Sequence, residues 1–144
     1  MAEYALRSLL DKERPGKTKV LSAGTYGAEG YPATMFAVEA AKTWDLNLRP
    51  HKSRSLTPEM IEEADLILVM APEHHREVTS MVPEAAERTY LLKKFPDNSP
   101  EGEKVDDPIG LDLEDYNQTF LEIGEYLGQH LPEIVERVDK KLNA

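Results

Sequence analysis

The segment DDPIG holds the residues best suited to acid chemistry, because Asp106 and Asp107 precede Pro108 there. A carboxylic acid donates a proton to a leaving oxygen when it comes within hydrogen-bond distance of that oxygen. Pro108 restrains the residue before it and favours an extended backbone at Asp107. Most Asp-Asp-Pro tripeptides, however, form ordinary turns. The residues alone therefore leave both a general acid and a turn open.

Four further side chains lie in segments without regular periodicity or at their borders. Ser22 lies in SAGT and His51 in PHKSR, and by themselves they read as a strand-end hydroxyl and a surface imidazole. Tyr26 and Tyr31 lie in the glycine-rich segment TYGAEGYP. Their rings could stack on an aromatic ligand or simply pack against the protein. The sequence does not decide between these alternatives.

Two adjacent histidines, His74 and His75, fall on an expected helix. Neighbouring residues on a helix point about 100° apart, so they cannot share a metal as an i, i+4 pair does. We expect both to be solvated helix residues. No other pattern suggests a ligand set, and we expect neither a metal nor a cofactor.

Composition excludes several classes of function for these 144 residues. They contain no cysteine, which excludes disulfides, cysteine metal sites and a cysteine nucleophile among them. The net charge of −10 disfavours nucleic acid and anionic membranes as partners. No run of 18 apolar residues and no signal-peptide pattern occur, so we expect a cytoplasmic protein.

Helix-type and strand-type patterns alternate along the chain. The clearest strand is DLILVM, whose continuous apolar run indicates burial on both faces. Thr57 as N-cap and Pro58 after it mark a helix start. A long irregular loop, with three prolines and two glycines, covers residues 93–111. The expected helices are 2–13, 33–46, 57–64, 72–82 and 112–142, and the expected strands are 18–24, 65–70 and 88–92.

This order predicts an open parallel sheet with helices on both faces, formed by one domain. Such sheets usually begin with a strand whose carboxyl end leads into a helix, where ligands bind. Here the first expected element is already that helix.

Several motifs in this order resemble the low-molecular-weight protein tyrosine phosphatases. They are MAE-x-x-L-x-x-L, SAGT, H-x-x-R-x-L-T, ADLILVM followed by His, and DDPIG before DYNQTFLEI. Each motif alone is weak, but their order and spacing from Met1 to about Leu131 are fairly specific. The resemblance implies a doubly wound, three-layer α/β domain around a four-stranded parallel sheet.

The resemblance also assigns roles. It makes Asp107 the general acid, and it makes Ser22 and His51 residues that brace the phosphate-binding loop. Tyr26 and Tyr31 would flank the entrance of the substrate pocket. The substrate would be a phosphoprotein.

In the family, a strand and a C-x5-R-S-P loop precede the MAE motif. We therefore expect residues 1–144 to form a single phosphatase-like domain that is N-terminally truncated and lacks the first, central strand. Without the cysteine we expect this chain to be inactive by the family mechanism. The empty strand position would leave room for closure of its neighbours or for self-association.

Several alternatives stay open. Ile109 and Gly110 follow Asp-Pro, where tyrosine-specific eukaryotic members carry aromatic residues. This departure resembles bacterial members, some of which act on phosphoarginine. The absence of cysteine from residues 84–105 argues against the related arsenate reductases. A non-catalytic binding module is the second function class, and a flavodoxin-like carrier is a distant third.

Overall fold

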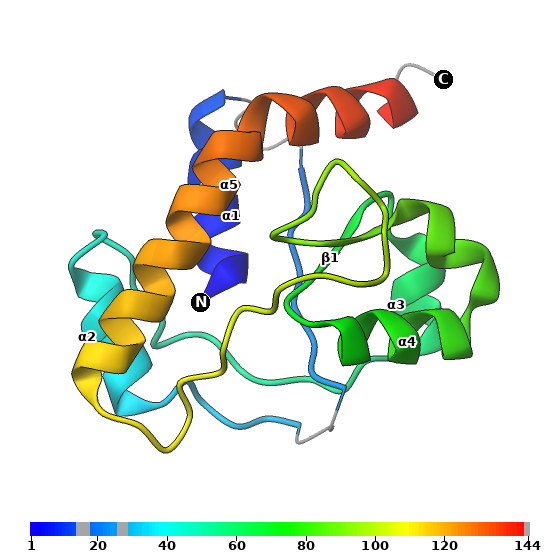
Figure 1. Cartoon of the computed structure of the whole chain (residues 1–144). Coiled ribbons are helices and arrows are strands. Elements are labelled where there is room, and N and C mark those ends of the chain that lie inside the picture. The colour runs from blue at the N-terminus through cyan, green and yellow to red at the C-terminus, as the bar shows by residue number, and fades with distance from the viewer. Residues whose placement is uncertain (14–17, 26–28, 143–144) are drawn as a thin grey trace. The chain divides into compact units, whose positions relative to one another are not determined.

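The computed structural model describes residues 1–13, 18–25 and 29–142 and divides the chain into two compact units (Figure 1). The first unit comprises residues 1–55 and 107–128, and the second comprises residues 56–106 and 129–144. The helices are α1 (Ala2–Glu13), α2 (Met35–Lys42), α3 (Pro58–Glu63), α4 (Pro72–Met81) and α5 (Leu113–Leu142), with a 3₁₀ helix η1 (Pro83–Arg88) and strands β1 (Ile67–Val69) and β2 (Thr89–Leu91).

The second unit is built on two parallel strands. Ile67 of β1 pairs with Thr89 of β2, and Val69 pairs with Leu91. The α/β class with parallel strands is thus confirmed. Side chains from both strands and from α3, α4 and η1 form one apolar core, which contains Ile61, Val69, Val78, Val82, Ala85 and Leu91.

The second half of α5 belongs to the second unit and packs through Arg137. Its guanidinium donates a hydrogen bond to the Tyr90 hydroxyl. It also lies over two aromatic rings, 5.2 Å from the centroid of Tyr90 and 5.7 Å from that of Phe95. Such cation–π contacts are stronger where water is excluded, and both rings are buried. Arg137 therefore joins the helix to β2 and the loop after it.

The first unit packs α2 against the first half of α5. Trp44 stacks on Phe120 at a centroid distance of 6.4 Å, and Phe36 meets Tyr116 edge-on at 5.9 Å. Gly124 lies under the Trp44 ring, where an added Cβ would come within 3.4 Å of it. These contacts bring the N-terminal end of α2 next to the start of α5.

Side chains cap the starts of α2, α3 and α5, whereas α4 begins after Ala71 without a side-chain cap. Thr57 accepts a hydrogen bond from the Met60 N–H, and Thr34 caps α2 in the same way. Asp112 and Asp115 accept each other's backbone N–H at the start of α5. The helix predicted over 33–46 ends earlier, at Lys42, because Asp45 adopts a positive φ of 61° and reverses the chain.

The strand predicted over 18–24 is wrong. The ladder contact formed there among the described residues is a parallel bridge between Gly24 and Ser55, in which the Gly24 N–H donates to the Arg54 carbonyl at 2.9 Å. Side-chain exposure still alternates as in a strand, with Thr18, Val20 and Ser22 half-buried. A strand requires a neighbouring strand for its backbone hydrogen bonds, and no described segment pairs with residues 18–23. The described sheet therefore has two strands.

We predict that Ile61→Ala lowers the free energy of unfolding by about 3 kcal/mol, because the side chain is 1% exposed and its removal leaves a cavity. Denaturant unfolding followed by circular dichroism measures the loss. Met81→Ala, at the exposed end of α4, is the control and should cost under about 1 kcal/mol. Equal losses in the two variants would contradict this description of the core.

Candidate functional site

A buried carboxylate lies in the first turn of α1. Glu3 is 6% exposed, and its two oxygens accept hydrogen bonds of 2.6 Å from the Ser22 hydroxyl and from the Arg7 guanidinium. A buried charge is stable only when it is paired and hydrogen-bonded, and Glu3 meets both conditions. The first turn of α1 is therefore tied to the segment that carries Ser22.

Arg7 strengthens the same connection. Its Nη2 atom donates to the carbonyl of Val20 at 2.7 Å as well as to Glu3, and the guanidinium lies over the Tyr4 ring at 5.0 Å. One side chain thus binds a carboxylate, a backbone carbonyl and an aromatic face. This geometry uses the planar, multidentate guanidinium and would not be reproduced by lysine.

His51 completes the group. Its Nδ1 atom lies 4.0 Å from the Glu3 Oε1 atom, and its ring meets Tyr4 edge-on at 5.7 Å. Burial lowers the pKa of His51, and the charges of Arg54 and Arg7 lower it further, while Glu3 opposes the shift. The imidazole is therefore neutral at pH 7 and able both to donate and to accept a hydrogen bond.

The pKa of Glu3 is also below its ordinary value. Burial raises it, but the hydrogen bonds from Ser22 and Arg7 and the positive charge of Arg7 outweigh burial. Glu3 is consequently ionised at neutral pH, next to a neutral imidazole. We call Glu3, Arg7, Ser22 and His51 the Glu3 cluster.

Asp107 lies in an exposed turn. Its Oδ1 atom accepts the Ile109 N–H at 3.0 Å, Pro108 is buried, and Gly110 adopts a φ of 82° that favours glycine. The turn predicted as one alternative is therefore real, and it leaves the second carboxylate oxygen open to solvent. Within the described part of the chain, no hydrogen bond or ion pair joins Asp107 to the Glu3 cluster.

The two tyrosine predictions differ in outcome. Tyr26 lies outside the described residues. The backbone of Tyr31 is held by Ser53, whose hydroxyl accepts the Tyr31 N–H at 3.0 Å and whose N–H donates to the Tyr31 carbonyl at 2.7 Å. The ring itself is 64% exposed. Tyr31 is thus available for contact with another molecule.

The prediction that both adjacent histidines are solvated is wrong for His75, which is 6% exposed. Its neighbour His74 is only half-buried, as their separation around the helix requires. Among the described residues, no group of three or more histidine, aspartate or glutamate side chains is arranged to hold a metal ion. Within that same part of the chain, every helix is too short or too polar to cross a bilayer.

The sequence predicted Ser22 and His51 as site residues, but it did not predict Glu3 and Arg7, which complete the cluster. The signal for Glu3 was an acidic side chain in the first turn of a helix, a common solvated position that the helix dipole favours. Its burial depends on the distant Ser22 and could not be predicted from its neighbours. Arg7 lies one turn after Glu3, at the spacing of a surface ion pair.

The whole chain, residues 1–144, matches the family described as low molecular weight phosphotyrosine protein phosphatase. The protein therefore belongs to this family. The confirmed membership agrees with the resemblance seen in the motifs.

Individual relatives are named for different phosphorylated residues, tyrosine or arginine. The protein-arginine-phosphatase of Bacillus subtilis is 34% identical over 129 residues, which are 90% of this chain and 83% of the relative. The low molecular weight protein-tyrosine-phosphatase Etp of Escherichia coli K12 is 40% identical over 87 residues, or 60% of this chain. That match spans 58% of the length of Etp, less than two thirds of it.

Solved structures show the same fold. A C-to-S mutant of the YwlE arginine phosphatase, with its active-site serine phosphorylated, superposes with a TM-score of 0.83 at 32% identity, covering 92% of this chain and 85% of the other. A low molecular weight protein tyrosine phosphatase from T. tengcongensis gives 0.81 at 31% identity, covering 92% and 88%.

We predict that Glu3→Gln reduces the dependence of stability on pH. A carboxylate whose pKa is lowered by folding stabilises the native state above its unfolded pKa, near 4.5, and loses this effect as pH falls through the folded pKa. The free energy of unfolding of the unmodified chain should therefore fall below about pH 4.5, and more steeply than that of the variant. Urea unfolding at pH 3 to 6 measures both slopes.

The exposed Glu13 at the other end of α1 provides the control for this measurement. Glu13→Gln should follow the unmodified chain over the same pH range. The description of Glu3 as a buried, ionised hydrogen-bond acceptor fails if Glu3→Gln shows an unchanged slope.

Proposed function

We propose that this chain provides the scaffold and the proton donor of a phosphoprotein phosphatase. The observation that carries the proposal is the family match over the full 144 residues. It is supported by the exposed turn at Asp107, the residue that the motif resemblance makes the general acid. Most of the chemical roles come from the resemblance. The Glu3 cluster adds a local geometry that is consistent with them.

In the proposed reaction, a thiolate attacks phosphorus while the bond from phosphorus to the leaving oxygen breaks. Asp107 donates its proton to that leaving oxygen from its Oδ2 atom, because its Oδ1 atom accepts the Ile109 N–H. Water then attacks the phosphocysteine and releases phosphate. The 144 residues contain no cysteine, so the thiolate has to come from outside them.

Ser22 and His51 would act as positioning residues. The Ser22 hydroxyl donates to Glu3 at 2.6 Å, and the His51 Nδ1 atom lies 4.0 Å from the same carboxylate, so both side chains lie at the first turn of α1. Helix N-termini favour anions, because their backbone N–H groups and dipole point toward them. A phosphate-binding loop placed at this end of α1 would be braced by these two side chains.

We propose that the phosphorylated residue of the substrate is either phosphotyrosine or phosphoarginine. Relatives of both names match the chain. Ile109, two residues after Asp107 and 67% exposed, would offer an apolar contact, and the exposed ring of Tyr31 would offer an aromatic one. Aliphatic Ile109 removes the aromatic neighbour expected for a tyrosine-specific enzyme, and this favours the arginine alternative. Comparing hydrolysis of phosphotyrosine and phosphoarginine peptides separates the two.

We predict that the 144-residue chain alone does not hydrolyse p-nitrophenyl phosphate. Joining a segment with the family's strand and C-x5-R-S-P loop ahead of Met1 should create this activity. In the joined protein, Asp107→Asn should lower kcat by about 10²- to 10⁴-fold, because the leaving oxygen loses its proton donor. Steady-state kinetics with the chromogenic substrate measure the effect.

The neighbouring carboxylate supplies the matched control. Asp106 is exposed and lies 3.6 Å from Lys104, so Asp106→Asn should change kcat less than about threefold. Turnover by the 144-residue chain that survives Asp107→Asn would contradict the proposal. A joined protein that folds and binds phosphate but remains inactive would favour the non-catalytic binding module.

We also propose that the segment over residues 18–23 pairs with a second copy of itself. Its side chains alternate as in a strand, and the Thr18 hydroxyl is buried without a partner among the described residues. Unpaired strand edges are templates for association.

Sizing with light scattering should then show a mass that doubles as concentration rises. Leu21→Pro should suppress the dimer, since proline removes a ladder donor, whereas Leu21→Ala should not. A monomer at every concentration would exclude this pairing.

A further inference from the structure

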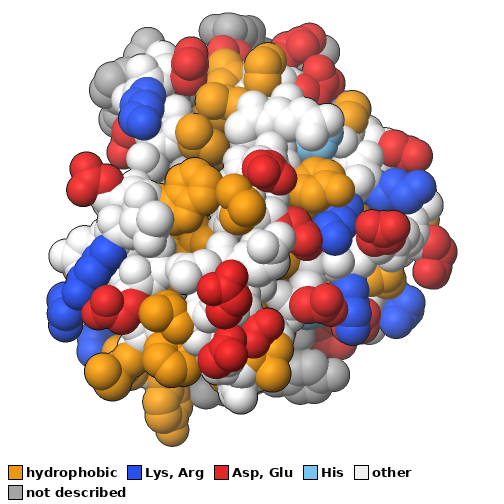
Figure 2. All heavy atoms as spheres, turned by 60° about the vertical axis from the view of Figure 1, so that its left-hand side comes forward, with side chains coloured by type: hydrophobic (Ala, Val, Ile, Leu, Met, Phe, Trp, Pro, Cys, Tyr) orange, Lys and Arg blue, Asp and Glu red, His pale blue; other side chains and the backbone are white. Residues whose placement is uncertain are grey.

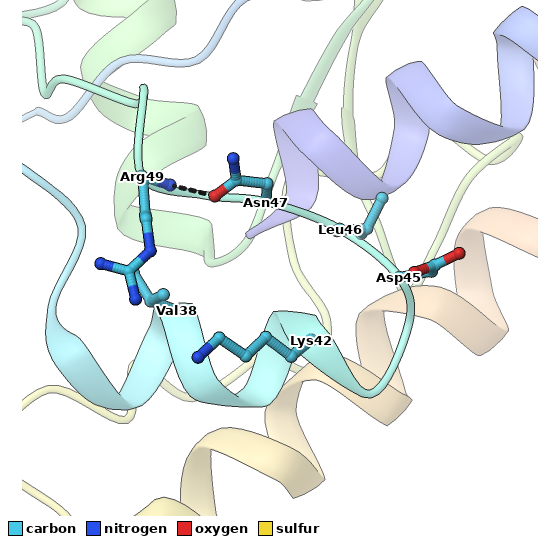
Figure 3. A pocket seen from close by; sticks show the side chains of 6 residues that line it. All are labelled: Val38, Lys42, Asp45, Leu46, Asn47 and Arg49. Atoms are coloured by element: carbon cyan, nitrogen blue, oxygen red, sulfur yellow. Dashed lines mark hydrogen bonds between the residues drawn. The ribbon is translucent and has the colours of Figure 1, made fainter.

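The outer face of α2 is hollowed. A depression of about 430 Å³ lies between this helix and the segment after it (Figure 3), lined by Val38, Lys42, Asp45, Leu46, Asn47 and Arg49. A second depression of about 210 Å³ shares Val38 and Arg49 with the first and extends it to Pro32, Ala33, Met35 and Glu39. The larger volume is in the range of small-molecule sites.

The polar groups of the larger depression converge from two elements. Lys42 and Arg49 extend toward the same space beside Val38, whereas Asp45 points away from it (Figure 3). The Arg49 N–H donates to the Asn47 Oδ1 atom at 3.1 Å, which leaves the Asn47 amide N–H groups available. In the described part of the chain, the Arg49 guanidinium forms no hydrogen bond or ion pair. Ammonium and guanidinium donors therefore face one hollow.

Glu39 is the internal anion that competes for these donors. It accepts a hydrogen bond of 2.9 Å from Lys42, but both side chains are about half exposed, and pairs of this kind are weak and screened by salt. The hydrogen bond and charge of Lys42, together with the charge of Arg49, lower the pKa of Glu39. Both cations thus already stabilise negative charge at this place, in a protein whose net charge is −10.

The other end of the hollow is apolar. Met35, Val38 and Lys42 follow one another at i, i+3 and i+7, so they lie along one face of α2. Met35 is 82% exposed, and the space-filling view shows apolar side chains gathered at the lower left of the surface (Figure 2). A single exposed methionine at the edge of a cationic hollow offers contact to an apolar group attached to the anion.

We propose that this face of α2 binds a small organic anion. A carboxylate or phosphate group lies between Lys42 and Arg49, and the apolar body of the ligand contacts Met35 and Val38. Arg49 provides the fork that matches such oxygens in pairs. The site uses neither Asp107 nor the Glu3 cluster, so it stands or fails independently of the proposed phosphatase function.

Titration of the full chain with phenylphosphonate, followed by ¹⁵N NMR, tests the site. We expect saturable shifts confined to residues 32–49. Arg49→Gln should weaken binding at least tenfold and Lys42→Gln about threefold. Arg76→Gln, at another exposed arginine, on α4, should leave binding unchanged. Inorganic phosphate should bind at least fivefold more weakly, because it lacks the apolar body.

Each contrary result would contradict a different part of the proposed anion site. Shifts that appear at residues 3, 22, 51 or 107 instead of on α2 overturn the site and indicate binding at the Glu3 cluster or the Asp107 turn. Equal binding by Arg49→Gln and the unmodified chain, with both folded by circular dichroism, removes the anion contact. Equal binding of inorganic phosphate removes the apolar contact. Arg49→Lys provides a second variant, which should bind with intermediate strength because it keeps the charge and loses the fork.

Discussion

The buried carboxylate of Glu3 holds together three parts of the first unit. It accepts hydrogen bonds from Ser22 and Arg7, so the first turn of α1 and the segment after it share one acceptor, and the His51 ring of the loop before Arg54 lies 4.0 Å from it. Removing one partner of such a group leaves the others desolvated and unpaired, which is why buried polar networks behave as units. The proposed phosphatase role depends on this group, because it contains Ser22 and His51, the two side chains that the resemblance places around a phosphate loop.

Positive charge is used mainly for structure in this acidic chain. Arg88 donates to the carbonyls of Ile61 and Ala64 at the end of α3, each at 3.0 Å, where cations complement the helix dipole. Arg7 and Arg137 bind a carbonyl or a hydroxyl and lie over aromatic rings. Arg49 differs from these three, because its guanidinium has no such partner among the described residues. Its availability is one basis of the anion site proposed on the face of α2.

Local sequence patterns predicted most helices and strands, but almost none of the contacts in the Glu3 cluster. Periodicity and caps predicted α1, α3, α4 and α5, and the apolar run DLILVM predicted β1, since each depends on nearby residues. The strand expected over 18–24 failed because strand formation needs a partner, which its own residues cannot specify. Ser22 and His51 were chosen through the family resemblance. Glu3 escaped notice because its burial comes from a contact 19 positions away.

In the turn that holds Asp107, the residues that position the carboxyl group differ from those that form the surface around it. Its shape depends on the buried ring of Pro108, on the positive φ of Gly110 and on the bond from the Ile109 backbone. The side chains of Ile109 and Leu111 take no part in that shape, and both are more than half exposed. Substitution of these two side chains can therefore change the surface beside the carboxyl group, while the carboxyl group keeps its place.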